Sequence, residues 1–319
     1  MVEVIDQEIT QDYSVYNGDC VEVARGIPKD SIHYSIFSPP FASLYTYSNS
    51  ERDMGNCKSD EEFMEHFGFL VDELMRVIMP GRLVSFHCMQ LPINKQTNGY
   101  IGLRDFRGDL IRLFQARGFI YHSEVCIWKD PLIAATRTKA LGLAHKQLVK
   151  DSAMSRQGIA DYLVTMRKPG TNQEPISHGA GLDEYCGELE APHAPWDDDP
   201  SKNKYSHHVW QRYASPVWFD INQFRTLQKE SARDERDERH ICPLQLDVIE
   251  RAITLWTNPC DIVLSPFAGI GSEGYVAVQM NRRAVLIELK ASYYKQARLN
   301  LADAVKHKSR VDMVDLMSG

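Results

Sequence analysis

The sequence lacks long apolar runs and paired cysteines. No stretch of its 319 residues approaches the ~18 consecutive apolar residues that a membrane-spanning helix needs. The beginning, MVEVIDQEIT, is acidic and has no apolar core of the kind found in secretory signals, which favours a cytoplasmic protein. The seven cysteines are scattered without a Cys-x-x-Cys pair, which argues against a zinc site and against a disulfide framework. We therefore expect neither a metal site nor a membrane partner.

Positive charges are also outnumbered, since 36 Lys and Arg stand against 43 Asp and Glu and the formal net charge is −7. This excess of negative charge counts mildly against nucleic acid as a partner. The charge is uneven, however. Residues 129–170 hold eight Lys or Arg against three Asp, whereas residues 183–200 hold seven acids and no base. A local basic stretch can bind phosphates even on an acidic protein. Charge alone leaves open whether this stretch binds phosphates or is simply a solvated face.

What the chain does have is alternation of strand and helix patterns. This alternation runs through residues 13–128 and returns from residue 241 onward. Between them, residues 129–240 are dominated by Pro, Gly, His and charged residues, with a convincing strand only at 161–168. Alternating strands and helices predict a mostly parallel sheet covered on both faces. We expect one α/β sheet interrupted by a region of different character.

A glycine-rich loop follows a strand near the C-terminal end. The strand at 261–264 runs into FAGIGSEG, then a helix, then a second strand that ends at Glu288, nineteen residues after Gly269. This is the pattern of a nucleotide-binding βαβ unit, in which the acid binds ribose hydroxyls. A nicotinamide dinucleotide and S-adenosylmethionine both fit it. Only about thirty residues follow Glu288, so the remaining strands must come from the N-terminal zone.

The strand SIF at 35–37 ends in an unusual turn, Ser38-Pro39-Pro40-Phe41. Proline lacks an N–H donor and fixes its own φ, so the strand must stop at Ser38. The segment VLSPFAG also ends a strand, and the carboxyl ends of neighbouring parallel strands meet where ligands bind. If the two strands are neighbours, the turn presents a hydroxyl, a carbonyl and a ring beside the nucleotide.

Several short motifs, in this order, resemble the DNA amino-methyltransferases, which methylate adenine N6 or cytosine N4. They are YNGDC at 16–20, IPKDS at 27–31, SIFSPPF, HICPL at 240–244, SPFAGIGS and IELKASYY. With the SPPF turn first and the glycine loop last, the order is similar to the permuted beta arrangement, and the match spans 13–170 and 240–302. The resemblance implies a Rossmann-like class I methyltransferase sheet with helices on both faces and an inserted target-recognition region. It divides the chain into a catalytic half (1–170), a target-recognition region (171–239) and a cofactor-binding half (240–319).

The resemblance also implies residue roles. Ser38 Oγ and the Pro39 carbonyl would accept the two amine hydrogens, held still by Pro39 and Pro40, while Phe41 stacks on the flipped base. Asp19 and Cys20 would lie at the adenine of S-adenosylmethionine and Glu288 on its ribose. The full set of implied cofactor residues is Asp19, Cys20, His240, Pro243, Ser265, Phe267, Ala268, Gly269, Gly271, Ser272 and Glu288.

One position departs from the family pattern. Ser265 stands where the family loop usually opens with an acid, and Glu273 is a candidate to compensate. The implied partner is double-stranded DNA, contacted by the basic residues Arg137, Lys139, Lys146, Lys150 and Arg156. The aromatic residues Trp210, Tyr213, Trp218 and Phe219 are expected mainly to form a small core.

Ser38 at the first position of the turn favours cytosine N4 as the methylated atom, with adenine N6 as the alternative. Two other classes remain open: an NAD-dependent oxidoreductase, and a non-catalytic relative that binds DNA or cofactor. The sequence also leaves open the recognition site, a homodimer, and a bacterial restriction-modification pair with a cognate restriction enzyme as opposed to a solitary, for example phage, methyltransferase.

Overall fold

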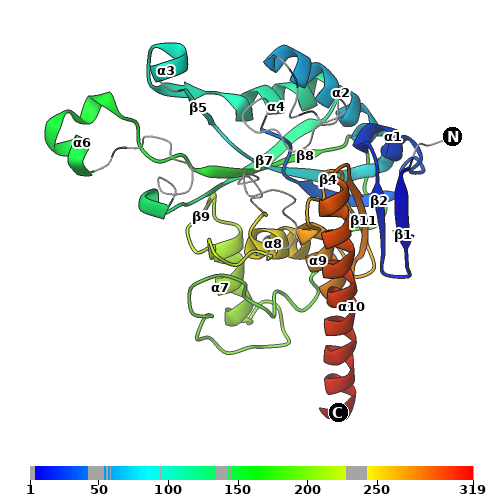
Figure 1. The fold of residues 1–319 in the computed structure, drawn as a ribbon. Helices are drawn as coiled ribbons and strands as arrows, with labels where there is room; N and C mark the ends of the chain where they lie inside the picture. Colours follow the sequence, from blue (N-terminus) through cyan, green and yellow to red (C-terminus); the bar gives the residue numbers. More distant parts are fainter. Residues whose placement is uncertain are drawn as a thin grey trace.

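The computed structural model describes residues 4–41, 54, 57, 59–93, 95–133, 143, 145–227 and 243–318 of the chain, with side chains to residue 308 in the last helix (Figure 1). Within these residues, nine strands form one sheet in the order β1-β2-β11-β10-β3-β4-β8-β7-β9. The strands are β1 (Asp6–Ile9), β2 (Tyr13–Asn17), β3 (Ile32–Phe37), β4 (Ile78–Met89), β7 (Ile120–Ile127), β8 (Asp161–Arg167), β9 (Val217–Trp218), β10 (Ile262–Ser265) and β11 (Arg283–Glu288). A separate hairpin pairs β5 (Leu91–Ile93) with β6 (Gly102–Arg104).

The strand order puts the two ends of the chain together. Strand β10 pairs in parallel with β3, with Val263 opposite Tyr34 and Leu264 opposite Ser35. The chain runs from β10 to β11 on one side and from β3 to β4 on the other, so the winding reverses between β10 and β3. Ligands of doubly wound sheets bind at such a reversal, beyond the carboxyl ends of the strands. The expected neighbourhood of the two Ser-Pro strand ends is therefore confirmed.

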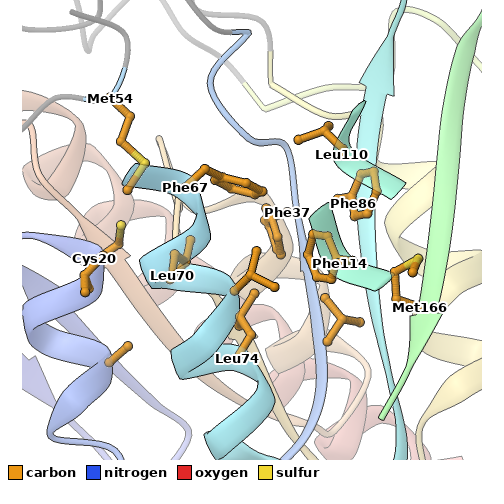
Figure 2. Close-up of a cluster of buried hydrophobic side chains, with 14 of the residues drawn as sticks. Cys20, Phe37, Met54, Phe67, Leu70, Leu74, Phe86, Leu110, Phe114 and Met166 are labelled. Atoms are coloured by element: carbon orange, nitrogen blue, oxygen red, sulfur yellow. The ribbon is translucent and has the colours of Figure 1, made fainter. Parts of the chain in front are cut away.

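One face of the sheet is covered by α1 (Cys20–Arg25), α2 (Asp60–Val77) and α4 (Phe106–Ala116) (Figure 1). Helix α2 buries side chains at intervals of three and four residues, including Phe67, Leu70 and Leu74, because these positions fall on one side of a 3.6-residue helix. Figure 2 shows them facing Phe37 and Phe86 of the sheet. This aromatic core fixes the position of β3 and therefore of the turn that follows it.

Helix α2 is capped by a serine. Ser59 is the N-cap, its hydroxyl accepting from the Glu62 N–H (3.2 Å), and the helix ends at Val77. Pro80 and Gly81 lie within β4. Helix termini are local features that shift by one or two residues without changing the packing.

The opposite face is covered by α8 (Leu246–Trp256), α9 (Ser272–Gln279) and α10 (Ala291–Ser318). Helix α10 extends beyond the rest of the protein toward the C-terminal end (Figure 1). None of the described helices has the length and apolar character needed to cross a bilayer.

The region between the two α/β segments adds pieces to the sheet edge. Helix α7 (Lys204–Tyr213) leads to β9, which pairs with β7. Of the four aromatic residues expected to form a small core, Tyr213 and Trp218 are buried, whereas Trp210 and Phe219 are each 56% exposed. Helix α6 (His145–Lys150) buries no residue and lies far from α1 and β1, at the outer end of the segment between β7 and β8 (Figure 1). Short elements α3 (Lys95–Asn98) and η3 (Ser152–Met154) complete the described structure.

Candidate active site

The candidate site lies where the carboxyl ends of β2, β11, β10, β3 and β4 meet at one edge of the sheet. Registers place Glu288 opposite Asn17 and Phe37 opposite Phe86. The glycine loop follows β10, and the Ser38–Phe41 turn follows β3. The sheet itself therefore brings the two motifs side by side.

The acid at the end of β11 is bonded to the glycine loop. Glu288 Oε2 accepts from the Gly269 N–H (2.7 Å), and Oε1 accepts from the Lys290 N–H (2.8 Å). A carboxylate oxygen can accept more than one hydrogen bond, which is the chemistry that ribose hydroxyls require. The acid and the loop form one hydrogen-bonded unit.

The two glycines of the loop differ in what surrounds them. Gly269 has a φ of +53°, and no described heavy atom lies within 4 Å of the point where a Cβ would stand. Gly271 has a φ of +87°, and a Cβ there would lie 3.2 Å from the Ala297 Cβ of α10. Gly269 leaves the loop backbone open to a ligand, whereas Gly271 allows α10 to pack closely.

Asp19 and Cys20 lie at the neighbouring end of β2. Asp19 Oδ1 accepts from the N–H groups of Val21 (2.9 Å) and Glu22 (3.0 Å), so this residue caps α1. The Cys20 thiol is buried in the hydrophobic core beneath α2, and burial raises its pKa well above the ordinary value. The Gly18 N–H donates to the Glu288 carbonyl (3.1 Å), which holds both residues beside the acid.

Ser265 and Glu273 are buried polar residues at the same edge. The Ser265 hydroxyl is fully buried and has no hydrogen-bond partner among the described residues. Glu273 is buried in the first turn of α9, where burial, with a smaller effect of Glu288, raises the pKa of its carboxyl to about 8. The open loop at Gly269, the Glu288 acceptors and the unpaired Ser265 hydroxyl suit a ligand that carries hydroxyl and ammonium groups. These residues fit S-adenosylmethionine.

The other expected cofactor residues have mixed surroundings. The Phe267 ring packs on Phe37 (centroids 5.8 Å apart) and stacks on Phe67 (6.3 Å). Ala268 and Ser272 are buried, and Pro243 is half-buried just before α8. Helix α8 precedes β10 in the chain, and its 11 residues span about 16 Å. The start of α8 therefore lies toward the carboxyl edge of the sheet, about 16 Å from the end of the helix. His240 lies outside the described residues.

The Ser38–Phe41 turn is part of a chain of hydrogen bonds that the sequence analysis missed. Ser38 Oγ lies 3.1 Å from His87 Nδ1, and His87 Nε2 lies 2.9 Å from Asp161 Oδ2. Lys129 forms an ion pair with the same Asp161 oxygen. His87 is on β4, Asp161 is the first residue of β8, and Lys129 follows β7. Each is a polar residue at the carboxyl edge of the sheet, which is the signal that could have identified them.

The charge of Asp161 is set by its neighbours. Burial alone would raise the pKa of its carboxyl, but the electrostatic and hydrogen-bond interactions with His87 and Lys129 hold that pKa below its ordinary value. The second oxygen, Oδ1, has no hydrogen-bond partner among the described residues. Asp161 is therefore a buried anion that holds His87 Nε2 through one oxygen.

The remaining residues of the turn are packed in place. Pro39 and Pro40 are buried, and the half-buried Phe41 ring lies edge-on to the His87 ring (centroids 6.5 Å apart) and 6.3 Å from the Phe106 ring. The turn therefore has little freedom to move its hydroxyl relative to His87.

The expected DNA-binding residues are spread along the region of α6. Lys146 and Lys150 are exposed on this helix. Arg156 is half-buried, and its Nη1 donates to the Gln157 carbonyl (3.1 Å). Arg137 and Lys139 lie outside the described residues.

Two groups of side chains away from this edge have the residue types of metal ligands, among the described residues: His33 with Glu174 and Asp261, and Cys186 with Asp247 and Glu250. An arginine lies against the acids in each group. Arg82 Nη1 is 3.1 Å from Asp261, and Arg225 pairs with Asp247 (2.7 Å) and Glu250 (2.5 Å). These arginines already supply the positive charge that such acids need.

The fold is a Rossmann-like sheet that carries the Ser38–Phe41 turn before the glycine loop in the chain. The DNA methylase family matches residues 32–299, and the chain belongs to this family of N6 and N4 methyltransferases. The expected family and its cofactor, S-adenosylmethionine, are thereby confirmed, which decides against the nicotinamide alternative.

Curated relatives include the type II methyltransferase M.BglII of Bacillus subtilis, 23% identical over 88% of this chain and 66% of its own length. The DNA adenine methyltransferase YhdJ of Escherichia coli is 31% identical over 36% of each chain. The chain thus spans about two thirds or less of the length of these relatives.

Solved structures show the same fold. TTHA0409 of Thermus thermophilus, solved with S-adenosylmethionine, has a TM-score of 0.61 at 19% identity and covers 92% of this chain and 96% of its own. The cytosine-N4-specific PvuII DNA methyltransferase has a TM-score of 0.57 at 15% identity and covers 97% of this chain and 96% of its own.

Proposed function

We propose that the protein transfers a methyl group from S-adenosylmethionine to the N4 amine of a cytosine that has left the DNA duplex. The observation that carries the proposal is the position of Ser38. It ends β3 beside the glycine loop of β10, and its hydroxyl is held by His87 (3.1 Å). Methylation of adenine N6 is the alternative.

The chemistry requires acceptors at the amine. The lone pair of an exocyclic amine is delocalised into the base, and acceptors on its hydrogens draw the nitrogen toward the geometry of a nucleophile. Ser38 Oγ and the Pro39 carbonyl are placed for this role, and the two buried prolines fix them before the base arrives. The Phe41 ring, fixed against Phe106 and His87, offers a surface on which the flipped base stacks.

The preference for cytosine follows from the first residue of the turn. In the family resemblance, this position is usually Asp in adenine enzymes and often Ser in cytosine enzymes. An uncharged hydroxyl accepts a hydrogen bond more weakly than a carboxylate does, so the difference has a chemical consequence. The relatives point both ways, since YhdJ is described as an adenine enzyme and PvuII as a cytosine enzyme.

The cofactor supplies a methyl group on a positively charged sulfur. Glu288 would hold the ribose, the Gly269 backbone and Ser265 would face the methionine portion, and the β2 end at Asp19 and Cys20 would border the adenine. Pro243, Phe267, Ala268, Gly271 and Ser272 would shape the surrounding walls, and His240 is proposed from the resemblance alone.

DNA would lie along the carboxyl edge of the sheet and the region of α6. Lys146 and Lys150 are exposed there, and Leu148 and Val149 on the same helix are also exposed, as expected of a surface that is covered by a ligand. We assign residues 171–239 to target recognition, between a catalytic half (1–170) and a cofactor half (240–319) of one domain.

The test is mass spectrometry of nucleosides from DNA incubated with the protein and S-adenosylmethionine. N4-methylcytosine is the expected product. N6-methyladenine alone would overturn the choice of base but support the class, and no methylated nucleoside on any DNA would favour a non-catalytic relative.

A further inference from the structure

We propose that His87, oriented by Asp161, receives through the Ser38 hydroxyl the proton that the amine loses on methylation. This inference rests on the proposed function and deepens it. In this proposal His87 is the proton acceptor and Asp161 is the residue that positions it. Neither residue belongs to a motif of the family resemblance.

The geometry sets the direction of the hydrogen bonds. An ionised Asp161 can only accept, so His87 Nε2 donates its hydrogen to Asp161 Oδ2 (2.9 Å). A neutral imidazole carries one hydrogen, which leaves Nδ1 as an acceptor, and we assign the Ser38 hydroxyl as its donor (3.1 Å). The lone pairs of Ser38 Oγ are then free to accept from the amine. Without this arrangement the serine hydrogen could itself face the amine and repel it.

The proton transfer balances in three steps. The amine nitrogen forms a bond to the methyl carbon while the carbon–sulfur bond breaks, and its electron pair stays on sulfur. The nitrogen, now with a positive charge, gives one hydrogen to Ser38 Oγ while the serine hydrogen moves to His87 Nδ1. The methylated amine and Ser38 end neutral, and the new imidazolium lies next to the Asp161 carboxylate until it loses its proton to solvent.

The groups around His87 fit this role. From the turn after β3 come Ser38 and the edge-on Phe41 ring, from β8 comes Asp161, and Lys129 follows β7. On α4, Arg107 is directed instead to Glu124 of β7 (2.9 Å). Lys129 shares the Asp161 oxygen with His87, so it limits how strongly the carboxylate stabilises the imidazolium. Because the imidazolium is less strongly stabilised, His87 can release its proton to solvent between turnovers.

A purely structural role for His87 is the competing explanation, and one substitution separates the two. In His87→Asn the amide oxygen stands near the former Nδ1 position, so it still accepts from Ser38 but takes no proton in the working pH range. We expect this variant to keep its cofactor and DNA affinities while single-turnover methyl transfer falls by about 10²-fold. We expect the wild-type rate to fall at low pH, where a protonated His87 cannot accept the proton, and we expect this acid limb to be absent from the variant.

Asp161→Asn tests the positioning residue. Removing the carboxylate disfavours the imidazolium, so the acid limb should move to lower pH and the plateau rate should fall. His33→Gln is the matched control, because His33 lies on β3 with its Nδ1 accepting from Ile262 N (3.1 Å) and its Nε2 3.6 Å from Asp261, away from the candidate site. This variant should keep both the rate and the pH profile.

A second readout does not depend on methyl transfer. In the whole protein, nitrogen chemical shifts of the His87 ring should report an Nε2–H tautomer, and Asp161→Asn should weaken that preference. A wild-type rate and acid limb in His87→Asn would overturn the inference, as would an Nδ1–H tautomer in the wild type. Failure of the wild type to methylate any DNA would instead refute the proposed function, because the tautomer measurement stands apart from it.

Discussion

The two strand ends at the centre of the sheet look alike in sequence but differ in how their serines are held. Ser38-Pro39 ends β3 and Ser265-Pro266 ends the adjacent strand β10. Ser38 Oγ belongs to a chain that continues through His87 and Asp161 to Lys129. Ser265 Oγ is fully buried and has no partner among the described residues.

The difference indicates two ways of preparing a site. At the proposed catalytic turn, the Ser38 hydroxyl is already held by the protein, as preorganisation requires. On the cofactor side, the buried Ser265 hydroxyl is left for a ligand to bind by a hydrogen bond. The raised pKa of Glu273 favours its protonated form, which a positively charged ligand could ionise. The catalytic side should therefore respond to mutation mainly in rate, and the cofactor side mainly in affinity and stability.

The largest effect outside the hydrogen-bonded chain is expected for Phe41→Ala. Loss of the stacking surface should lower kcat/KM for DNA by roughly tenfold to a hundredfold, about 1–3 kcal/mol, while cofactor affinity stays the same. Steady-state methylation and calorimetry measure the two quantities. Phe41→Trp, which keeps a ring, is the control, and an equal loss in that variant would point to misfolding of the turn.

Glu273 should make the stability of the cofactor side depend on pH. Its folded-state pKa of about 8 lies above its ordinary value of 4.5, so the native state binds the proton more tightly. Stability is therefore present below the ordinary value and is lost as pH rises toward and past 8. Relative to wild type, Glu273→Gln should gain about 4 kcal/mol of unfolding free energy between about pH 5 and about pH 9.

Denaturant unfolding at the two pH values measures this gain. Glu22→Gln, which changes a partly exposed acid of α1, controls for the loss of one negative charge. An equal gain in both variants would show that net charge rather than burial of Glu273 is responsible.

Glu288→Ala should weaken S-adenosylmethionine binding by about tenfold, because the proposed ribose acceptor and the carboxylate that holds Gly269 are lost together. The single-turnover rate at saturating cofactor should change little. A large fall in that rate with unchanged affinity would place Glu288 outside the ribose site.

The smallest expected effect is that of Ser265→Ala, and its sign is informative. Removing a buried hydroxyl without a partner among the described residues should leave the free energy of unfolding unchanged or raise it by up to about 0.5 kcal/mol, while cofactor affinity falls less than about threefold. Ser35→Ala is the matched control on the adjacent strand, because that hydroxyl donates to the Leu264 carbonyl (2.9 Å) and its loss should cost about 1 kcal/mol. Equal destabilisation of both variants would mean that Ser265 has a partner.

Sequence reasoning identified the two strand ends because their chemistry is local. Proline ends β3 at a fixed residue, and the glycine loop and Glu288 are tied by a spacing within one βαβ unit. It did not identify His87 and Asp161, which are 74 residues apart and meet only through the antiparallel register of β4 and β8. No local pattern encodes that register. The sequence also could not predict that Trp218 is buried and Phe219 is exposed, because these exposures follow from the pairing of β9 with β7.

A paired measurement on Ser38→Ala tests most directly whether the turn after β3 controls the rate without affecting cofactor binding. Single-turnover transfer of a labelled methyl group to DNA and calorimetric binding of S-adenosylmethionine are measured on the same preparation. We expect transfer to fall by about 10²–10³-fold, the scale of losing one preorganised polar group, with cofactor affinity unchanged within about twofold. Wild-type transfer in this variant, or a parallel loss of cofactor binding, would contradict the account.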